Sequence, residues 1–322
     1  MKTTVVGGYP KVLLDQKLRK AYHATDDGKM TAPELAAVQD DVTAAAIHEM
    51  DEAGLDVVND GLIRWDDEIT HIAGKLHGIK IGGLIRFFDT NTFHRRPKAT
   101  AAVEWAEPIV AGDFMFATGA TAKPVKAVVT GAYSIAKASD YEGVYASFGH
   151  LALDIAAALN DELKSLVAAG ANYIHINDPF ILLDPSYFPV FAECIHVMLD
   201  GIDAHTSLYT YFGDATPLYD KMLALPVDAL GFDFTYSPGI IDKLTDCSCT
   251  KEVGAGVFDA RNTKPEDENV ILATLARLAK AVGGDRIWVS PTASLEYLPL
   301  GKCRDKLREM VRIVGAFKGV QK

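Results

Sequence analysis

Four aspartates follow short apolar runs of the kind that form β-strands. They are Asp60, Asp178, Asp233 and Asp259. If the runs are neighbouring parallel strands, their carboxyl ends share one edge, where the four carboxylates repel one another. At least one of these carboxyls is then expected to have a raised pKa, unless a cation or a substrate amine lies among them. The alternative is that some of them cap the helices that follow, as aspartate often does.

Two phenols belong to the same predicted edge. Tyr209 and Tyr211 alternate with Thr210 along a strand and therefore share one face. If that face points into the site, the phenols can donate hydrogen bonds to an oxyanion, act as general acids or stack on a flat substrate. The alternative places both rings in the packed wall of the protein.

A basic cluster offers a third kind of chemistry. His94, Arg95 and Arg96 are adjacent in the chain, and a guanidinium group presents a planar fork that fits a carboxylate or a phosphate. We therefore consider them as a clamp for an anionic substrate. The alternative is a solvated cluster of charges on a loop.

The elements that must position these residues alternate between two periodicities. Strands are predicted at 3–9, 56–61, 126–131, 173–178, 207–212, 229–234, 252–259 and 287–292. Helices are predicted between them, at 33–53, 145–169, 187–199, 266–282 and 303–317. Eight strands alternating with helices pair in parallel, which predicts an α/β fold of the (β/α)8 TIM-barrel type. The residues from about 65 to 105 break the alternation, so we predict an inserted β-hairpin over the barrel mouth within one domain spanning residues 1–322.

Composition narrows the classes of function. The chain has 322 residues, with 32 Lys and Arg against 43 Asp and Glu, and a net charge of −11. This acidity argues against nucleic acid or an anionic membrane surface as a partner. The sequence also lacks a long apolar stretch or an export signal, and four cysteines are too few for a disulfide framework, which predicts a cytoplasmic protein. Cys247 and Cys249 are expected at the end of the barrel opposite the site and Cys194 in a buried helix, whereas Cys303 opens the last helix, with a place at the mouth left open as the minor alternative.

Several motifs in sequence order resemble the catalytic domain of cobalamin-independent methionine synthases. TTVVGGYP at 3–10 is similar to the family's TT-x-IGSFP, FHRRP at 93–97 to RC-x-RPP, and VGAGVFD at 253–259 to IGPGVYD. Residues 52–57, 123–131 and 168–179 are similar to E-x-GLD-x, KPVKG-x-LTGP and AG-x-x-x-IQIDEP. The resemblance implies a (β/α)8 barrel whose relatives transfer a methyl group from a folate to a zinc-bound thiolate.

The chain departs from this family at the residues that carry the chemistry. The family binds zinc through His-x-Cys on strand 5, Glu on strand 6 and Cys after strand 8. Anchoring strand 5 on the following Tyr, Phe and Asp aligns these ligands with Thr206, Leu208, Asp233 and Ala293. A competing alignment gives His205 and Ser207 on strand 5, which also lacks a thiolate. The resemblance therefore predicts that the zinc site is lost and that no metal is bound.

The implied amino-acid pocket is changed as well. Gly8 replaces a serine, Leu62 a glutamate and Asn177 an aspartate of the family pattern. We therefore predict that the chain does not make methionine. The predicted substrate-binding residues are His94, Arg95, Arg96, Gly8, Asn177, Asp178 and Asp259, and the predicted catalytic residues are Tyr209, Tyr211, Asp233 and Asp60.

Two hypotheses of function follow. In the first, the barrel transfers a methyl or one-carbon group from a pterin or corrinoid carrier to an acceptor other than homocysteine, with Asp178 near the carrier and Asp233 as the base. In the second, a metal-free lyase, decarboxylase or hydrolase acts on a small anionic substrate through Arg95, Arg96 and acid–base groups. The ionisable residues at the strand ends argue against a binding protein without activity. No tightly bound cofactor is predicted. The expected partner is a small molecule, and a methyl-carrier protein and a homo-oligomer are left open.

Overall fold

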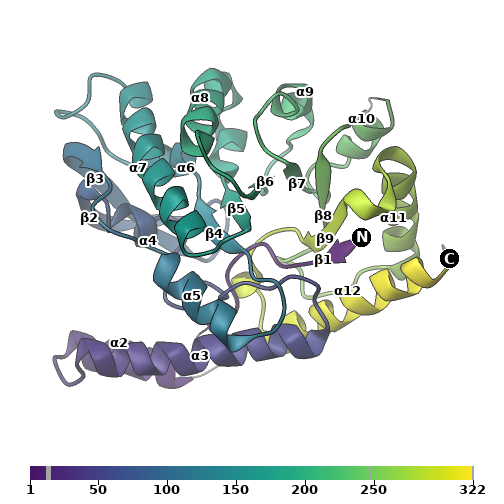
Figure 1. Ribbon diagram of the computed structural model, residues 1–322, viewed down its shortest axis with the longest axis horizontal. Coiled ribbons are helices and arrows are strands. Elements are labelled where there is room, and N and C mark those ends of the chain that lie inside the picture. Colours follow the sequence, from purple (N-terminus) through teal and green to yellow (C-terminus); the bar gives the residue numbers. More distant parts are fainter. Residues whose placement is uncertain (12–15, 247–248, 321–322) are drawn as a thin grey trace.

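The computed structural model describes residues 1–11, 16–246 and 249–320. Their main feature is a curled sheet of parallel strands, ordered β1-β9-β8-β7-β6-β5-β4. The strands are β1 (Lys2–Thr3), β4 (Ala127–Thr130), β5 (Tyr173–Asn177), β6 (His205–Thr210), β7 (Ala229–Asp233), β8 (Glu252–Phe258) and β9 (Ile287–Pro291). Helices cover the outside of the sheet (Figure 1). The predicted α/β barrel is confirmed.

The first two predicted strands are the exceptions. The strand predicted at 3–9 is reduced to β1, and the one predicted at 56–61 is not a regular strand. Residues 56–58 lie between β1 and β4: the Val57 N–H donates to the Thr3 carbonyl, and Val58 forms a single parallel bridge with Val125. Beyond this point the chain leaves the ladder, because the Asn59 side chain bonds to the Gly7 carbonyl and to the Gly61 N–H. The segment thus links the two edges of the sheet without forming a regular strand over 56–61.

The helices begin and end close to the predicted positions. They are α3 (Ala32–Ala53), α7 (Phe148–Ala168), α8 (Phe188–Leu199), α11 (Glu268–Val282) and α12 (Leu300–Val320). In α3, Thr31 and Glu34 form a capping box at the start, and Gly54 ends the helix with a φ of 87°. Further helices were not predicted, namely α2 (Gln16–Asp26), α4 (Thr70–Ala73), α5 (Ala111–Ala120), α6 (Ala132–Ala138), α9 (Tyr219–Met222) and α10 (Ile240–Asp246). The pair α2 and α3 extends from the body of the molecule at the lower left of Figure 1.

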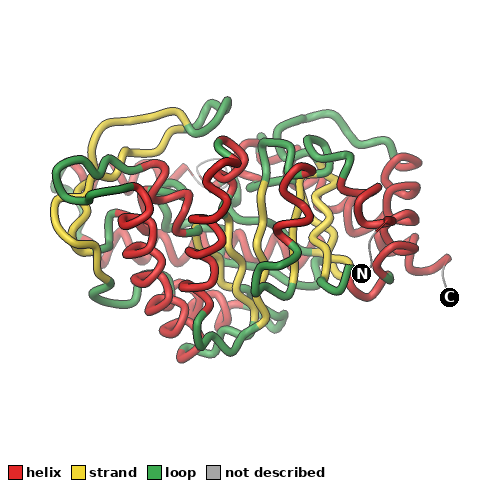
Figure 2. Tube along the Cα trace, turned by 90° about the horizontal axis from the view of Figure 1, so that it is seen from above, coloured by secondary structure: helices red, strands yellow, loops and turns green. Residues whose placement is uncertain are grey.

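The predicted inserted hairpin is present as the antiparallel strands β2 (His77–Arg86) and β3 (Phe93–Glu104). These two strands lie at the left of Figure 2, apart from the barrel strands. The hairpin tip packs on the carboxyl ends of β5 and β6, where Phe87 and Phe88 contact Phe180 and Phe212 with ring centroids 4.9–6.5 Å apart. The hairpin therefore covers part of the barrel mouth.

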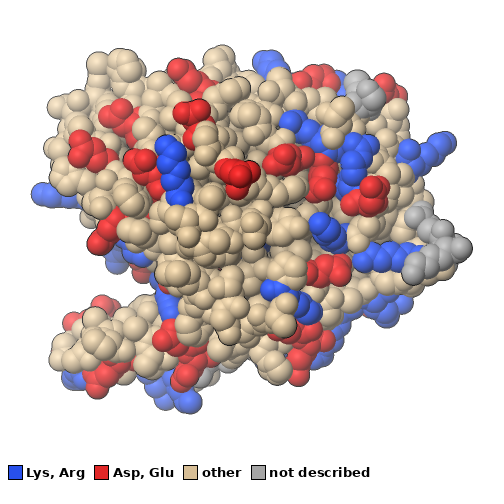
Figure 3. Space-filling model, viewed as in Figure 1, with Lys and Arg blue, Asp and Glu red and all other residues tan. Residues whose placement is uncertain are grey.

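The surface carries both signs of charge. On the face drawn in Figure 3, acidic and basic side chains are interspersed. Among the described residues, no helix is both long and apolar enough to cross a membrane.

Candidate functional site

A buried glutamate, Glu68, joins three parts of the barrel mouth. Its Oε2 accepts a hydrogen bond from the Tyr211 hydroxyl just after β6, and its Oε1 accepts one from Ser294 Oγ, 2.5 Å away, just after β9. The Glu68 carbonyl accepts a further bond from Thr130 Oγ1, at the end of β4. The side chain is 4% exposed. Glu68 is thus held among the carboxyl ends of strands, where barrel enzymes carry their sites.

The surroundings make Glu68 hard to ionise. Burial, and then the nearby Glu296 carboxyl, raise the pKa of Glu68 to about 7, against the opposing effect of the bonds from Ser294 and Tyr211. Burial also raises the pKa of Glu296. Perturbed carboxyls of this kind are frequent at functional sites.

Asp233, the last residue of β7, uses only one of its two carboxylate oxygens in hydrogen bonds. Its Oδ1 accepts hydrogen bonds from the Thr235 N–H at 2.9 Å, the Thr235 hydroxyl at 2.6 Å and the Tyr236 N–H at 3.3 Å. Its Oδ2 is buried and has no hydrogen-bond partner among the described residues. Burial raises the pKa of Asp233 to about 6, opposed mainly by the bonds from Thr235. One oxygen therefore caps the turn after β7, and the other is available for a ligand.

Of the other three predicted aspartates, Asp60 and Asp259 cap the turns that follow them, whereas Asp178 caps α6, which precedes it in the chain, and keeps a buried Oδ2 without a partner among the described residues. Asp178 Oδ1 accepts from the Ser134 N–H at 2.8 Å, Asp60 Oδ1 from the Leu62 N–H at 3.2 Å, and Asp259 Oδ1 from the Arg261 N–H at 2.8 Å. Burial raises the pKa of Asp60 and of Asp178 to about 7. Raised carboxyl pKa values, expected from the sequence, thus occur together with the capping alternative.

The two predicted tyrosines share the inward face of the barrel, as expected. Tyr211 reaches the mouth and Glu68. Tyr209 lies deeper, with its ring 4.2 Å from that of His175 and flat against Gly231 and Gly254. A Cβ on either glycine would lie 2.1–2.3 Å from Tyr209 atoms, so only glycine leaves space for this ring. Burial raises the pKa of both phenols far above neutral, and both are hydrogen-bond donors at pH 7.

This geometry corrects the alignment of the resemblance on β6. Thr206 lies at the amino end of β6, where its N–H and hydroxyl donate to Asp228 Oδ2 at 2.7 and 3.1 Å. That is the end of the barrel opposite the mouth, and Leu208 lies on the same outward side as Thr206. The inward positions of this segment are instead Tyr209, which lines the cavity at the amino end, and Tyr211, which reaches the mouth, so the alignment of the family's ligands with Thr206 and Leu208 was wrong.

The residues at the mouth do not fit the zinc site of the resemblance. Tyr211 is hydrogen-bonded to Glu68, and Ala293 offers no donor atom. Within the described part of the chain, no three His, Cys, Asp or Glu side chains are grouped as a metal site requires. Cys194, Cys249 and Cys303 are buried, while Cys247 lies outside the described residues.

The three residues of the basic cluster on the hairpin differ in burial. His94 is 2% exposed, with its ring 6.1 Å from that of Phe87 and 6.3 Å from that of Phe180. Neither ring nitrogen has a hydrogen-bond partner among the described residues. Arg95 and Arg96 are exposed, and Arg96 pairs with Asp140 at 2.9 Å. Only His94 therefore faces the aromatic residues of the mouth, and the three residues do not form a single clamp.

Gly8 and Asn177, the remaining predicted binding residues, lie beside the Glu68 cluster. The Gly8 N–H donates to Ser294 Oγ at 3.0 Å, and a Cβ on Gly8 would lie 3.2 Å from the Glu296 carboxyl carbon. Asn177 Oδ1 is 3.0 Å from His175 Nε2. The sequence analysis missed Glu68, Ser294 and Glu296. Their signals were the acidic run at 66–68 after the second predicted strand, and the polar pair at 294 and 296 after the last one.

Backbone strain is concentrated around the mouth. Among the described residues, the non-glycine residues with positive φ are Leu62 at 49°, Phe88 at 49° and Phe212 at 64°. Such conformations cost about 1–3 kcal/mol each and are frequent at functional sites. Phe88 and Phe212 pack on each other, and Phe212 also packs on Tyr297 at 5.4 Å. A cleft beside them is lined by Asp89, Thr90, Asn91, Thr92, Arg261, Glu296 and Tyr297.

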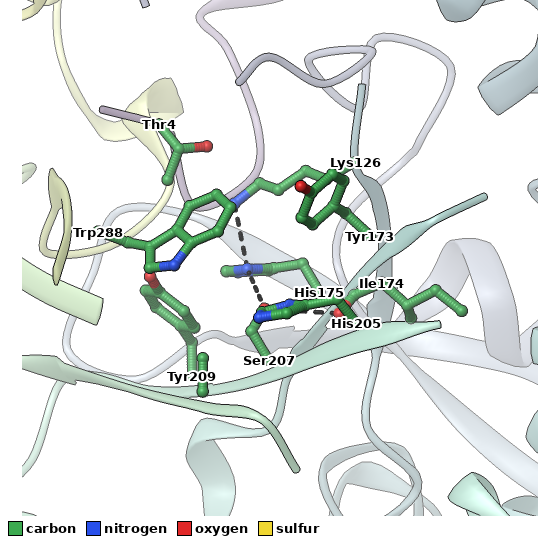
Figure 4. A pocket seen from close by; sticks show the side chains of 10 residues that line it. Thr4, Lys126, Tyr173, Ile174, His175, His205, Ser207, Tyr209 and Trp288 are labelled. Atoms are coloured by element: carbon green, nitrogen blue, oxygen red, sulfur yellow. Dashed lines mark hydrogen bonds between the residues drawn. The ribbon is translucent and has the colours of Figure 1, made fainter. Parts of the chain in front are cut away.

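The amino end of the barrel contains a different polar group, drawn in Figure 4. Lys126 Nζ donates to the Val5 carbonyl and lies 3.1 Å from His175 Nδ1, which also contacts Ser207 Oγ at 3.1 Å. Burial lowers the pKa of Lys126 to about 7 and that of His175 well below its usual value. Trp288, Tyr173 and His205 line the same small cavity, and Lys2 lies 4.3 Å over the Trp288 ring.

Comparisons with known proteins agree with this architecture. Residues 1–316 match the family described as "Cobalamin-independent synthase, Catalytic domain". A methionine synthase of Sulfurisphaera tokodaii is 30% identical over 316 residues, which cover 97% of this chain and 91% of that protein. A methionine synthase of Saccharolobus solfataricus is 28% identical, covering 97% and 93%. The solved B12-independent methionine synthase of Shewanella sp. W3-18-1 has a TM-score of 0.85 at 19% identity, covering 99% of this chain and 98% of that one.

Proposed function

The chain belongs to the cobalamin-independent synthase catalytic-domain family, and from that premise we propose that it transfers a methyl group from a pterin or corrinoid carrier to an acceptor that needs no zinc. The observation that carries this proposal is the free, buried Oδ2 of Asp233 at the inward end of β7. Asp233 stands where the resemblance implies a zinc ligand. A base is what an acceptor requires when no metal lowers its pKa.

The proposed step moves one proton and one methyl group. A lone pair of the acceptor attacks the methyl carbon, and the bond between that carbon and the carrier breaks, leaving its electron pair on the carrier. The acceptor proton passes to Asp233 Oδ2 and from there to the carrier or to solvent. Tyr211 and Ser294 hold Glu68 in place beside the reacting groups, and Asn177 and Gly8 border the same space.

Protein groups are expected to exclude water during this step. Phe87 and Phe88 of the hairpin tip pack against Phe180 and Phe212 of the barrel. An apolar cover of this kind strengthens the interactions of the carboxyls below it and limits side reactions with water. Substrates would enter by the cleft between the hairpin tip and Arg261.

A second candidate is a metal-free lyase or hydrolase. The presence of two carboxyls with raised pKa values and a protonated phenol favours it, since such a set suits proton transfers on a single substrate. The exposure of Arg95 and Arg96 argues against the anionic substrate first expected for it.

The test is a transfer assay with a labelled methyl group. The protein, treated with a chelator, is incubated with methyl-labelled methyltetrahydrofolate or methylcobalamin and a panel of thiol, amine and hydroxyl acceptors. We expect label in a non-thiol acceptor, and a loss of about 100-fold or more in Asp233→Asn, the usual range for a general base. Asp203→Asn, an exposed aspartate, is the control. Turnover of one compound without any donor would instead support the lyase.

A further inference from the structure

We infer that the methyl acceptor is an amine, held as its ammonium ion by Glu68 and Glu296 among the aromatic rings of the mouth. This inference rests on the proposed transfer reaction and names its acceptor class. Both glutamates border Ser294 and Gly8: Ser294 Oγ donates to Glu68 Oε1 at 2.5 Å and accepts the Gly8 N–H at 3.0 Å, and a Cβ on Gly8 would lie 3.2 Å from the Glu296 carboxyl carbon. Burying carboxyls together is costly unless a cation compensates them.

The cations of this region compensate these carboxyls only in part. The charge of Lys11 opposes the rise in the pKa of Glu296, but its Nζ donates to the Trp65 carbonyl. Arg261 donates to the Tyr236 hydroxyl at 2.5 Å and to the Asp89 carbonyl at 3.1 Å, and its guanidinium lies 5.0 Å over the Phe212 ring. Among the described residues, neither cation forms a hydrogen bond with Glu68 or Glu296. Glu68 in particular therefore lacks a cationic partner, and we expect it to prefer a positively charged ligand.

Two buried side chains with unused polar atoms also point to a ligand. Asp233 is 1% exposed, and its Oδ2 has no partner within the described chain. It lies on the inward face of β7, because Gly231, two residues earlier, contacts Tyr209 inside the barrel. The His94 imidazole, buried against Phe87 and Phe180, has two unpartnered nitrogens under the same criteria. Asp233 Oδ2 and one nitrogen of the neutral His94 ring can accept N–H groups of an ammonium ion, while the other His94 nitrogen carries a proton and can only donate.

The rings of the mouth suit the same ligand. Phe212 packs against Tyr211 at 4.9 Å, Tyr297 at 5.4 Å and Phe88 at 5.3 Å, and the Tyr211 hydroxyl bonds to Glu68, so this group of rings adjoins the glutamate. Aromatic faces attract organic cations, with about 2 kcal/mol or more where the cation is desolvated. They offer nothing comparable to an anion.

The chemistry of an amine also explains the absence of a thiol-activating site. An ammonium ion has no lone pair, so it must lose a proton before its nitrogen can attack a methyl carbon. Asp233 Oδ2 accepts that proton, the new bond forms between nitrogen and methyl carbon, and the carrier keeps the electrons of the broken bond. A carboxylate site thereby performs both binding and activation, which a thiol acceptor receives from zinc in the resembled family.

The experiment is a binding titration by calorimetry at pH 8 without a methyl donor. The probes are butylammonium, butyrate and 1-butanol, which share a chain length and differ in charge. We expect butylammonium to bind at least tenfold more tightly than either of the others. We expect Glu68→Gln to weaken butylammonium binding at least tenfold, and Glu107→Gln, which changes an exposed glutamate, to leave it unchanged.

The outcomes distinguish failure of the amine inference from failure of the transferase proposal. Preferred binding of butyrate, or unchanged binding of butylammonium by Glu68→Gln, overturns the amine inference. If Glu68→Gln does not give a folded protein by circular dichroism, Glu296→Gln is held to the same tenfold criterion. Binding of butylammonium without methyl transfer to any amine refutes the transferase proposal alone. Methyl transfer to a thiol or an anion refutes the amine inference and leaves the transferase proposal standing.

Discussion

The two ends of the barrel both bury ionisable groups, but they differ in what surrounds them. At the amino end, Lys126 bonds to the Val5 carbonyl and to His175, whose ring nitrogens also contact Ser207 and Asn177, so both side chains have neutral partners. At the carboxyl end, carboxyls lie together, Asp233 keeps a free oxygen, and Phe212 is held in a left-handed conformation. Satisfied polar groups stabilise a fold, whereas unsatisfied groups and strain cost stability and are kept where function requires them. The comparison assigns the chemistry to the carboxyl end, where buried polar atoms lack partners.

The largest effect on stability is expected deep in the barrel. Tyr209→Ala removes a buried ring that fills the space over Gly231 and Gly254, and the free energy of unfolding should fall by about 3–5 kcal/mol. Tyr209→Phe keeps the ring and should lose no more than about 1.5 kcal/mol. Urea denaturation of both variants measures the difference. Similar losses for the two would show that the hydroxyl, and not the packing, is what matters.

Lys126→Met, at the amino end of the barrel, is expected to raise the free energy of unfolding. The pKa of Lys126 is lower in the folded than in the unfolded chain, so between pH 7 and about 10.5 the unfolded chain binds more protons and stability rises with pH. Methionine removes this dependence, and the variant should exceed the wild type by roughly 1–3 kcal/mol at pH 7. The gain should shrink toward pH 10. Lys80→Met, at an exposed position, is the control, and an equal gain there would contradict the argument.

The pH dependence of methyl transfer tests the carboxyl end. Asp233 must be ionised to accept a proton, and its pKa is raised to about 6. The rate at saturating substrate should therefore rise about tenfold per pH unit below pH 6 and level off above it. A rate that is flat from pH 4.5 to 8 in a protein that stays folded would remove Asp233 from the role of base.

The smallest effect on stability and activity is expected for a substitution on the exposed surface of the hairpin. Arg96→Ala breaks an exposed pair with Asp140, which should change the free energy of unfolding by less than about 1 kcal/mol and leave the KM for the acceptor unchanged. Thermal unfolding and steady-state kinetics measure both. A large rise in KM would restore the anion clamp that the sequence suggested.

The sequence predicted the fold better than the site. Alternating strand and helix patterns located β4 to β9 and five long helices within a few residues, since local periodicity determines those elements. Of the missed helices, α5 is weakly amphipathic and α6 is short, whereas α2 has a clear amphipathic pattern that was overlooked. Tyr211 was recognised from its strand, but its partner Glu68 comes from a loop 143 residues earlier, and no local pattern records such a contact. The error at Thr206 and Leu208 arose from anchoring an alignment by residue type without checking which face each residue occupies.

The fit of Tyr209 over Gly231 and Gly254 also restricts which amino-acid substitutions these three positions tolerate. A smaller ring at position 209, such as histidine, would leave part of the space above both glycines empty, and adding a side chain at either glycine first would collide with the phenol. Each single step thus passes through a less stable intermediate, so the three positions must change nearly together. Substitutions at these three positions on neighbouring strands are therefore coupled. A library that varies residues 209, 231 and 254 together is the direct way to find other residues that fill this part of the barrel.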